Sequence, residues 1–356
     1  MVTDGGERMP DGGEAGGETD RASAFVSEAE YEWSKLDVIR EMYDRKFYAP
    51  LQIVLADYRG IFGIGILLMY LLMGTVGVAV IAFPRQTGGR FDPWFSSWHQ
   101  PLGTDHAGRP LHQMVVHATP GMIQLMVGGA LFAVLFGILI GTVAGFKRGN
   151  IEYVLMTLTD TAAQLPGLPL LIVLVAVFEP RSPFLVGLIL SINAWPGTAR
   201  ALRAQVIEIR EKDYVEATRA MGGDSGEIIQ REVMPELMPF VTIGFMGSLT
   251  GIIYAAVGLY FLGILPVEWL NWGVMLDNAY SEVNFRTFTH MHYLVVALVV
   301  ISLVGLGATL TAQAMDRVFN PRLRAKHAKT IRGSGPEDAI EEEDEDVTDT
   351  FLAGGN

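Results

Sequence analysis

The sequence predicts an all-α, polytopic membrane protein with about six transmembrane helices. Of its 356 residues 50% are hydrophobic, yet the formal net charge is −13, a combination that a single soluble domain rarely shows. The two properties are separated along the chain, because acidic residues crowd both ends and long uncharged apolar segments lie between them. Such segments cross a bilayer as helices, since a helix satisfies its own backbone hydrogen bonds.

Both ends of the chain are predicted to be solvated tails. Residues 1–30 form a disordered acidic tail, and residues 31–60 form a cytoplasmic segment next to the membrane. At the other end, residues 321–356 form a cytoplasmic tail that is acidic and disordered from about residue 333. The acidic excess resembles that of proteins from high-salt cytoplasms, which is a hypothesis about habitat only.

Two features that many proteins have are missing from the sequence, namely cysteines and a basic N-terminal signal peptide. The chain has no cysteine, which excludes disulfides, thiolate nucleophiles and Cys-ligated metal sites. The N-terminus is acidic where a signal peptide would be basic, so we expect the first span to remain uncleaved.

Four segments are apolar and long enough to cross about 30 Å of hydrocarbon, namely residues 61–83, 119–146, 237–267 and 291–315. Two further spans are weaker. Residues 153–178 carry Asp160 near their start, and residues 184–203 contain Pro196 followed by a glycine, a pair that disturbs a helix. Six spans are therefore expected, and they place both termini on one side of the membrane.

Basic residues predict which side that is, because cytoplasmic flanks carry an excess of Lys and Arg. Lys147 and Arg148 follow the second span, and further basic residues lie in the segment 207–236 and after the last span. We therefore expect a multi-pass protein of the cell membrane with both termini in the cytoplasm. Residues 84–118 become an external loop, and residues 119–320 form the helical core.

The cytoplasmic loop over residues 207–236 is predicted to hold two short helices. Residues 213–221 form the first, and Gly222 permits a positive φ at its end. Asp224 is a typical N-cap for the second helix, which Pro235 is expected to stop. Periodicity alone leaves two uses open: a connector lying on the membrane surface, or a knob that binds a cytoplasmic partner.

The residue identities of this loop resemble the EAA loop of ABC importer permeases. That family shows Glu-Ala-Ala, three residues, Gly, and later an apolar pair with Pro. Here Thr218 replaces the second Ala, and Glu232 stands where an apolar residue is usual. The matching residues are Glu216, Ala217, Gly222, Val233, Met234 and Pro235.

In that family the loop docks as a coupling helix into a groove of the ATPase subunit, so that closure of the ATPases rotates the membrane helices. The resemblance implies that the ATPase-coupling residues are Tyr214, Glu216, Ala217, Thr218, Ala220, Gly222, Asp224, Ile228 and Pro235. Gly222 is the most direct of these assignments, because a Cβ there would resist both the turn and the close approach of a partner backbone.

A second motif, upstream, narrows the resemblance to the C-type subunits of dipeptide and oligopeptide permeases. It resembles their Gly-Thr-Asp-x-x-Gly-Arg segment before the second span, although Pro110 follows the Arg where Asp is usual. Taken alone, such a Gly-rich segment is typical of an ordinary loop. Its residues are Gly103, Thr104, Asp105, Gly108 and Arg109. Further matches follow in order at residues 165–167, 194–200, 203–206, 272–276 and 320–324, so the resemblance covers about residues 83–324. It implies the type I ABC importer permease fold.

Candidates for the translocation path are Asp160, Pro166, Pro169, Trp195 and Pro196. The prolines lie inside the third and fourth spans, where they would remove helical hydrogen bonds and free carbonyls to line a polar path. A simple packing kink is the alternative. Asp160 is the one acid within a span, and it either faces the path or pairs with a nearby arginine.

Six of the seven histidines fall in the segments placed outside, namely His99, His106, His112, His117, His290 and His292. No pair has the spacing of a helical metal site, so no metal site is predicted. His290 and His292 are the weak candidates for one, and residues of the membrane interface are the alternative.

The resemblance implies a permease subunit that forms half of the translocation pathway of an ATP-driven importer. The chain contains no GxxxxGK[ST] loop, so it is not expected to be an enzyme or to bind a cofactor. ATP and Mg²⁺ are then used by partner subunits. The expected partners are a second, B-type permease, two ABC ATPase subunits, an extracellular solute-binding protein and the lipid bilayer, without nucleic acid.

Di- and oligopeptides are the default cargo, with nickel or another small solute as the alternative. Two other function classes are the alternatives to this one. A self-sufficient secondary transporter would need coupling-ion sites and usually internal repeats, whereas only Asp160 is available. A membrane-embedded enzyme would need paired acids, a Ser with His or an HExxH motif within the spans, and these are missing.

Overall fold

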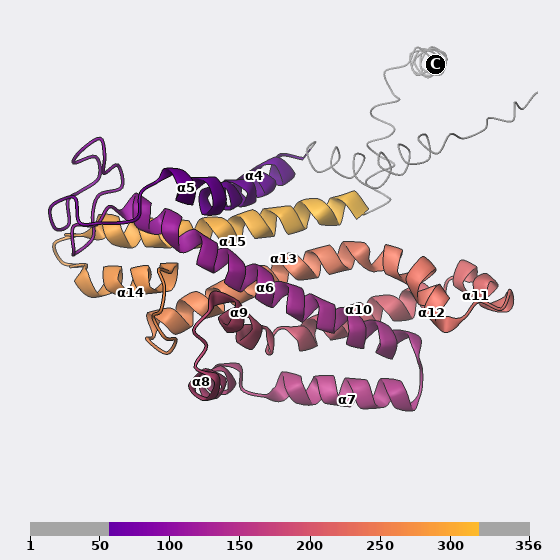
Figure 1. Cartoon of the computed structure of the whole chain (residues 1–356). Coiled ribbons are helices and arrows are strands. Elements are labelled where there is room, and N and C mark those ends of the chain that lie inside the picture. Colours follow the sequence, from indigo (N-terminus) through magenta and orange to yellow (C-terminus); the bar gives the residue numbers. More distant parts are fainter. Residues whose placement is uncertain (1–56, 320–356) are drawn as a thin grey trace, which may run out of the picture. The chain divides into compact units, whose positions relative to one another are not determined.

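The computed structural model describes residues 57–319, and all regular structure in that range is helical (Figure 1). This confirms the predicted fold class. The expected tails, residues 1–30 and 321–356, and most of the segment 31–60 lie outside the described residues.

Four helical stretches are long and apolar enough to cross a membrane, and they correspond to the four strong spans of the sequence. The first, Tyr58–Val80, consists of α4 (Tyr58–Leu72), a π-helical turn η3 (Met73–Gly77) and α5 (Val78–Val80). The others are α6 (Leu111–Phe146), the stretch Ser225–Phe261, and Met291–Asp316 within α15 (Met291–Phe319). Ser225–Phe261 begins earlier and ends earlier than the predicted residues 237–267.

The two weaker spans of the predicted six are both interrupted in the structure. Helices α7 (Asn150–Gln164) and α8 (Gly167–Phe178) meet at 88°, because Pro166 forces Leu165 into an extended conformation. Helices α9 (Pro183–Ser191) and α10 (Trp195–Arg210) are separated by a turn. By length and composition the described residues therefore provide four spans, or five if α7 and α8 count as one.

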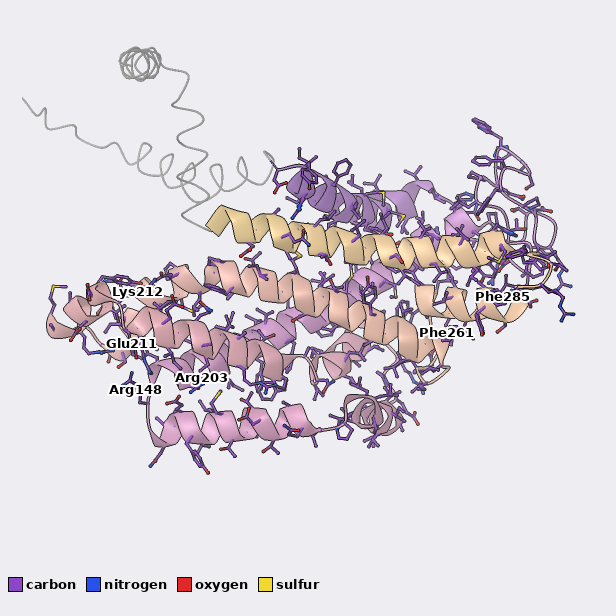
Figure 2. All side chains as sticks on the ribbon, turned by 180° about the vertical axis from the view of Figure 1, so that it is seen from behind. Arg148, Arg203, Glu211, Lys212, Phe261 and Phe285 are labelled. Atoms are coloured by element: carbon purple, nitrogen blue, oxygen red, sulfur yellow. The ribbon has the colours of Figure 1, made fainter. Side chains whose placement is uncertain are left out.

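The remaining helices lie near the two ends of the long ones. Helices α11 (Asp213–Ala220) and α12 (Ser225–Ile228) lie close to the turn between α6 and α7, and we call this the α11 end (Figure 1). Helix α14 (Trp272–Glu282) lies with the loop before α6 at what we call the α14 end. Figure 2 shows Arg148, Arg203, Glu211 and Lys212 together at the α11 end, and Phe261 and Phe285 at the other.

A central hydrophobic cluster joins α6 to α9, α13 (Met234–Phe261), α14 and α15. Within it the rings of Tyr70 and Trp272 meet edge to face, with centroids 5.4 Å apart. Helices α6 and α10 pack most closely, along glycines that recur every four residues of α6. A Cβ on Gly141 would lie 2.6 Å from the carbonyl oxygen of Ala199, and one on Gly145 would lie 2.7 Å from Val206 Cβ. The two backbones are thus in near-direct contact, as in small-residue helix pairs of membranes.

Candidate ATPase-coupling site

The predicted helix–turn–helix is present at the α11 end. The amide of Gly223 donates to the carbonyl of Thr218 at 3.1 Å, and the amide of Gly222 donates to that of Arg219 at 3.0 Å. This pair of bonds is a Schellman motif, which requires the positive φ of +91° found at Gly222. The carboxylate of Asp224 then accepts from the amide of Gly226 and caps α12.

The apolar side chains of this helix–turn–helix point into the protein. Val215 of α11 and Ile228 of α12 are buried in a cluster with the ends of three long helices. Its other buried members are Phe146 of α6, Leu202, Val206 and Ile209 of α10, and Val233 and Leu237 before and within α13. A helix lying on the membrane surface would turn its apolar face outward to lipid, so this packing argues against the connector alternative. It also places Ile228 inside, away from the surface on which a partner would dock.

The outer surface of α11 is open. Tyr214, Glu216, Ala217 and Ala220 are exposed, Thr218 is half-buried, and the side chain of Met221 at the helix end is 81% exposed. A Cβ on Gly222 would meet no atom within 4 Å. Tyr214, Ala217 and Met221 recur at helical spacing, so these exposed side chains share one side of α11. Met221 was absent from the predicted site, although its position just before the glycine turn was a usable signal.

Pro235 does not end the second helix, contrary to the prediction. The chain continues from α12 through a π-helical turn, η4 (Ile229–Val233), directly into α13, and Pro235 lies in the first turn of α13. A π turn already interrupts the regular hydrogen-bond ladder, so the missing amide of a proline is tolerated there. The coupling loop is therefore continuous with a membrane-spanning helix.

Polar contacts tie the start of α11 to the start of α13. Lys212 forms an ion pair with Glu236, and the hydroxyl of Tyr214 donates a hydrogen bond to the same carboxylate. Although the residue as a whole is exposed, desolvation of its ring hydroxyl, together with this bond and the negative charge of Glu236, raises the pKa of Tyr214. The phenol thus stays protonated and keeps donating throughout the physiological range.

The upstream motif lies at the α14 end, where its polar groups bond within the chain. Asp105 is 0% exposed, and one of its oxygens accepts from the amides of Ala107 and Arg109 at 2.9 and 2.8 Å. The other accepts from Arg109 Nε at 2.8 Å. Gly108 has a φ of +75°, and a Cβ there would lie 2.5 Å from the carbonyl oxygen of Gly88.

Thr104 fastens the same motif to the preceding loop and to α15. Its hydroxyl donates to the carbonyl of Gly89 at 2.7 Å and accepts from the amide of Asp92 at 2.8 Å. Its carbonyl lies 3.1 Å from Nε2 of His292, whose ring also packs against Gly103. The motif therefore holds the loop before α6 in shape.

The translocation-path candidates occupy two settings. Oδ1 of Asp160 lies 3.7 Å from Nη1 of Arg200 in α10. Pairing with a nearby arginine was the alternative to a role of Asp160 in the path. Trp195 is buried and meets Phe136 edge to face with centroids 5.0 Å apart. The path role itself stays a prediction.

The three prolines lie at helix starts rather than inside helices. Pro166 is the N-cap of α8, Pro169 is in its first turn, and Pro196 is in the first turn of α10. The amides of a first turn have no intrahelical partner, so these prolines remove no hydrogen bond within their own helices. The break at Pro166 does end α7, which leaves the last carbonyls of α7 without regular helical partners. The role of such carbonyls in a polar path stays a prediction.

Two of the histidines predicted to lie outside make contacts within the protein. The ring of His290 lies against Phe91 with centroids 3.8 Å apart, and Nε2 of His117 lies 2.9 Å from the carbonyl oxygen of Ile81. Within residues 57–319 no group of three or more metal-ligating side chains comes together.

Long apolar helices with an inward-packed helix–turn–helix are typical of a multi-pass membrane protein. The chain belongs to the family of binding-protein-dependent transport system inner membrane components, whose sequence profile matches residues 137–325. It is a multi-pass permease subunit of an ABC importer, as the coupling-loop resemblance predicted.

Similar proteins carry the names that the upstream motif led us to expect. The dipeptide transport system permease protein DppC of Bacillus subtilis is 28% identical over 271 residues, which cover 74% of this chain and 81% of that protein. The oligopeptide transport system permease protein OppC of Lactococcus lactis subsp. cremoris is 32% identical over 62% of this chain and 75% of the relative. The glutathione transport system permease protein GsiD of Pectobacterium atrosepticum is 25% identical over 63% and 73%.

Proposed function

We propose that this chain is the C-type permease subunit of an ATP-driven importer of di- or oligopeptides, and that α11 docks on a separate ATPase subunit. The docking proposal rests on the difference between the two sides of α11. Val215 is buried inside the protein, while Met221 and Gly222 are open to solvent. The cargo rests on similarity to permeases named for dipeptides, oligopeptides and glutathione.

The rest of the assembly follows from the same proposal. A B-type permease supplies the other half of the pathway, two ATPase subunits bind ATP and Mg²⁺, and an extracellular solute-binding protein delivers the cargo. The chain itself binds no cofactor. The α11 end faces the cytoplasm and both termini lie on that side, which the basic residues Lys147, Arg148, Lys212 and Arg231 support.

Gly222→Val tests the docking surface. The variant is expected to insert and assemble yet lose ATP-driven uptake in proteoliposomes, because the side chain strains the turn and occupies the space left for a partner. Gly263→Val is the matched control, since Gly263 also has a positive φ, +68°, with no atom within 4 Å of a Cβ. Normal uptake by Gly222→Val would overturn the docking role, and uptake by the chain without any ATPase would point to a secondary transporter.

The cargo is tested on the solute-binding partner. Its thermal unfolding midpoint is measured with a panel of di- and oligopeptides and with nickel, because a ligand that binds only the folded state raises that midpoint. Stabilisation by peptides supports the proposal. Stabilisation by nickel alone, with no response to any peptide, would replace peptide by metal as the cargo.

A further inference from the structure

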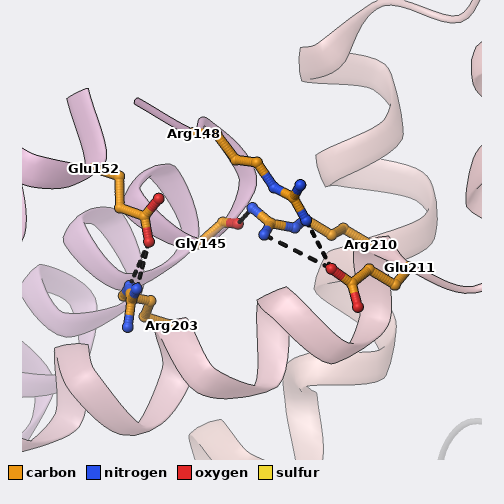
Figure 3. Close-up of polar contacts among 6 residues, drawn as sticks. All are labelled: Gly145, Arg148, Glu152, Arg203, Arg210 and Glu211. Atoms are coloured by element: carbon orange, nitrogen blue, oxygen red, sulfur yellow. Dashed lines mark hydrogen bonds and ion pairs between the residues drawn. The ribbon is translucent and has the colours of Figure 1, made fainter. Parts of the chain in front are cut away.

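A group of charged side chains joins the end of α10 to the turn between α6 and α7 (Figure 3). Glu211, the residue that follows α10, places Oε1 2.7 Å from Nη2 of Arg148 in that turn and 3.9 Å from Nη2 of Arg210. Arg210 in turn donates a hydrogen bond to the carbonyl of Gly145. We call Arg148, Arg210 and Glu211 the charge clamp.

The carbonyl of Gly145 explains why an arginine is useful there. It is one of the last carbonyls of α6, which have no amide partner within the helix. Only 9% of the Arg210 side chain is exposed, so its charged hydrogen bond to this carbonyl is largely shielded from water. A cation at a helix C-terminus is also favoured by the helix dipole. Arg210 therefore caps α6 from a different helix.

The charge clamp stands next to the coupling helix. Glu211 is followed at once by Lys212 and then by α11, and Lys212 is itself held by Glu236 of α13. The start of α11 is thus fixed to α6 on one side and to α13 on the other. A second ion pair, between Glu152 of α7 and Arg203 of α10, lies beside the clamp (Figure 3).

The helices on either side of the clamp are already in close contact. Along Gly141 and Gly145 the backbone of α6 touches α10 with no room for a Cβ. The buried cluster below α11 adds apolar contacts, which are non-directional. The charged hydrogen bonds of the clamp have preferred directions. The clamp thus adds directional contacts to a junction that is otherwise held by packing.

We infer that the charge clamp transmits movement of α11 to α6, and that Glu211 and Arg148 are positioning residues for coupling. The inference rests on the proposed function, since it assumes that an ATPase moves α11. Neither residue needs to touch the ATPase or the cargo. Their role is to make α11, α10 and the end of α6 move as one body.

The test uses the assembled importer in proteoliposomes, with uptake and ATP hydrolysis measured together. Arg148→Gln and Glu211→Gln are each expected to lower the uptake per ATP hydrolysed about fivefold. This factor corresponds to the upper end of the free energy that an exposed ion pair contributes. Thermal unfolding should change little, because the two side chains are 68% and 60% exposed. Arg59→Gln, which removes a half-buried arginine whose Nη1 donates to Gln313, is the control and should keep the wild-type ratio.

A cross-link distinguishes an ion pair that makes the helices move together from one that only stabilises the fold. The chain has no cysteine, so R148C together with E211C provides the only two thiols of this subunit for a short bifunctional thiol reagent. The cross-linked protein is expected to regain the wild-type ratio, whereas the same variant without reagent stays low. Unchanged ratios in both glutamine variants, or a cross-link that blocks uptake, would overturn the inference. Absence of ATP-driven uptake in the wild-type assembly would instead contradict the proposed function.

Discussion

The two ends of the molecule carry the two motifs by which the chain resembles its family, and they use them in opposite ways. At the α14 end Asp105 is fully buried, and its carboxylate bonds only to groups of its own chain. At the α11 end Met221 and Gly222 face open space. One motif is complete within the chain. The other presents exposed side chains and open space at its turn.

Two glycines with positive φ make the contrast sharper. A Cβ on Gly108 would lie 2.5 Å from a backbone oxygen, whereas a Cβ on Gly222 would meet no atom within 4 Å. Both turns need glycine for their backbone geometry. Only at Gly108 does the chain itself also exclude a side chain. A glycine at an open turn leaves room for a partner, which is the distinction that the predictions below test.

Asp105→Ala is expected to have the largest effect on stability. It leaves Arg109 and two backbone amides without their buried acceptor, and removing one member of such a group costs about 3 kcal/mol. The thermal unfolding midpoint in detergent should fall steeply. Glu282→Ala, at an exposed acid of the same end, is the control and should leave the midpoint near that of the wild type. An equal midpoint for both variants would mean that the motif does not hold the loop.

Exchange of the two glycines for alanine should have an intermediate effect and separate the two ends directly. Gly108→Ala combines backbone strain with a clash against Gly88 and should cost about 2 kcal/mol, whereas Gly222→Ala carries the strain alone and should cost about 1 kcal/mol. Thermal unfolding gives the order of stabilities. Uptake should follow the opposite order. Gly222→Ala is expected to be the more stable variant but the one with the lower uptake. Equal losses of uptake at equal protein levels would remove the distinction.

Much of the architecture was predictable because it depends on local signals. The four long spans follow from hydropathy, and the Gly222 turn and the Asp224 cap follow from residues whose backbone preferences are strong. Pro166 also marked the place where the third span breaks. The 88° bend itself could not be predicted from the length and hydropathy of the segment. Features of this kind need only a few neighbouring residues to be specified.

The features that sequence reasoning missed depend on distant partners. Ile228 was assigned to the coupling residues through the resemblance, but which side of its helix is buried depends on Phe146 and Leu237 from other helices. The cap that Arg210 provides for Gly145 joins residues 65 positions apart. The π turn that precedes Pro235 has no residue pattern that the sequence analysis could use.

Met221→Gln should have the smallest effect on stability and a large one on coupling. The side chain is 81% exposed, so its replacement should change the unfolding free energy by less than about 0.5 kcal/mol. If the side chain enters a groove of the ATPase, however, the variant places a polar amide in an apolar contact and weakens docking. Co-purification of the ATPase subunit and ATP-driven uptake should both fall, while Met221→Leu keeps them. Because stability is unchanged by design, a loss of uptake identifies the open end as the place where the partner binds, and retained uptake would assign the exposed methionine no role in coupling.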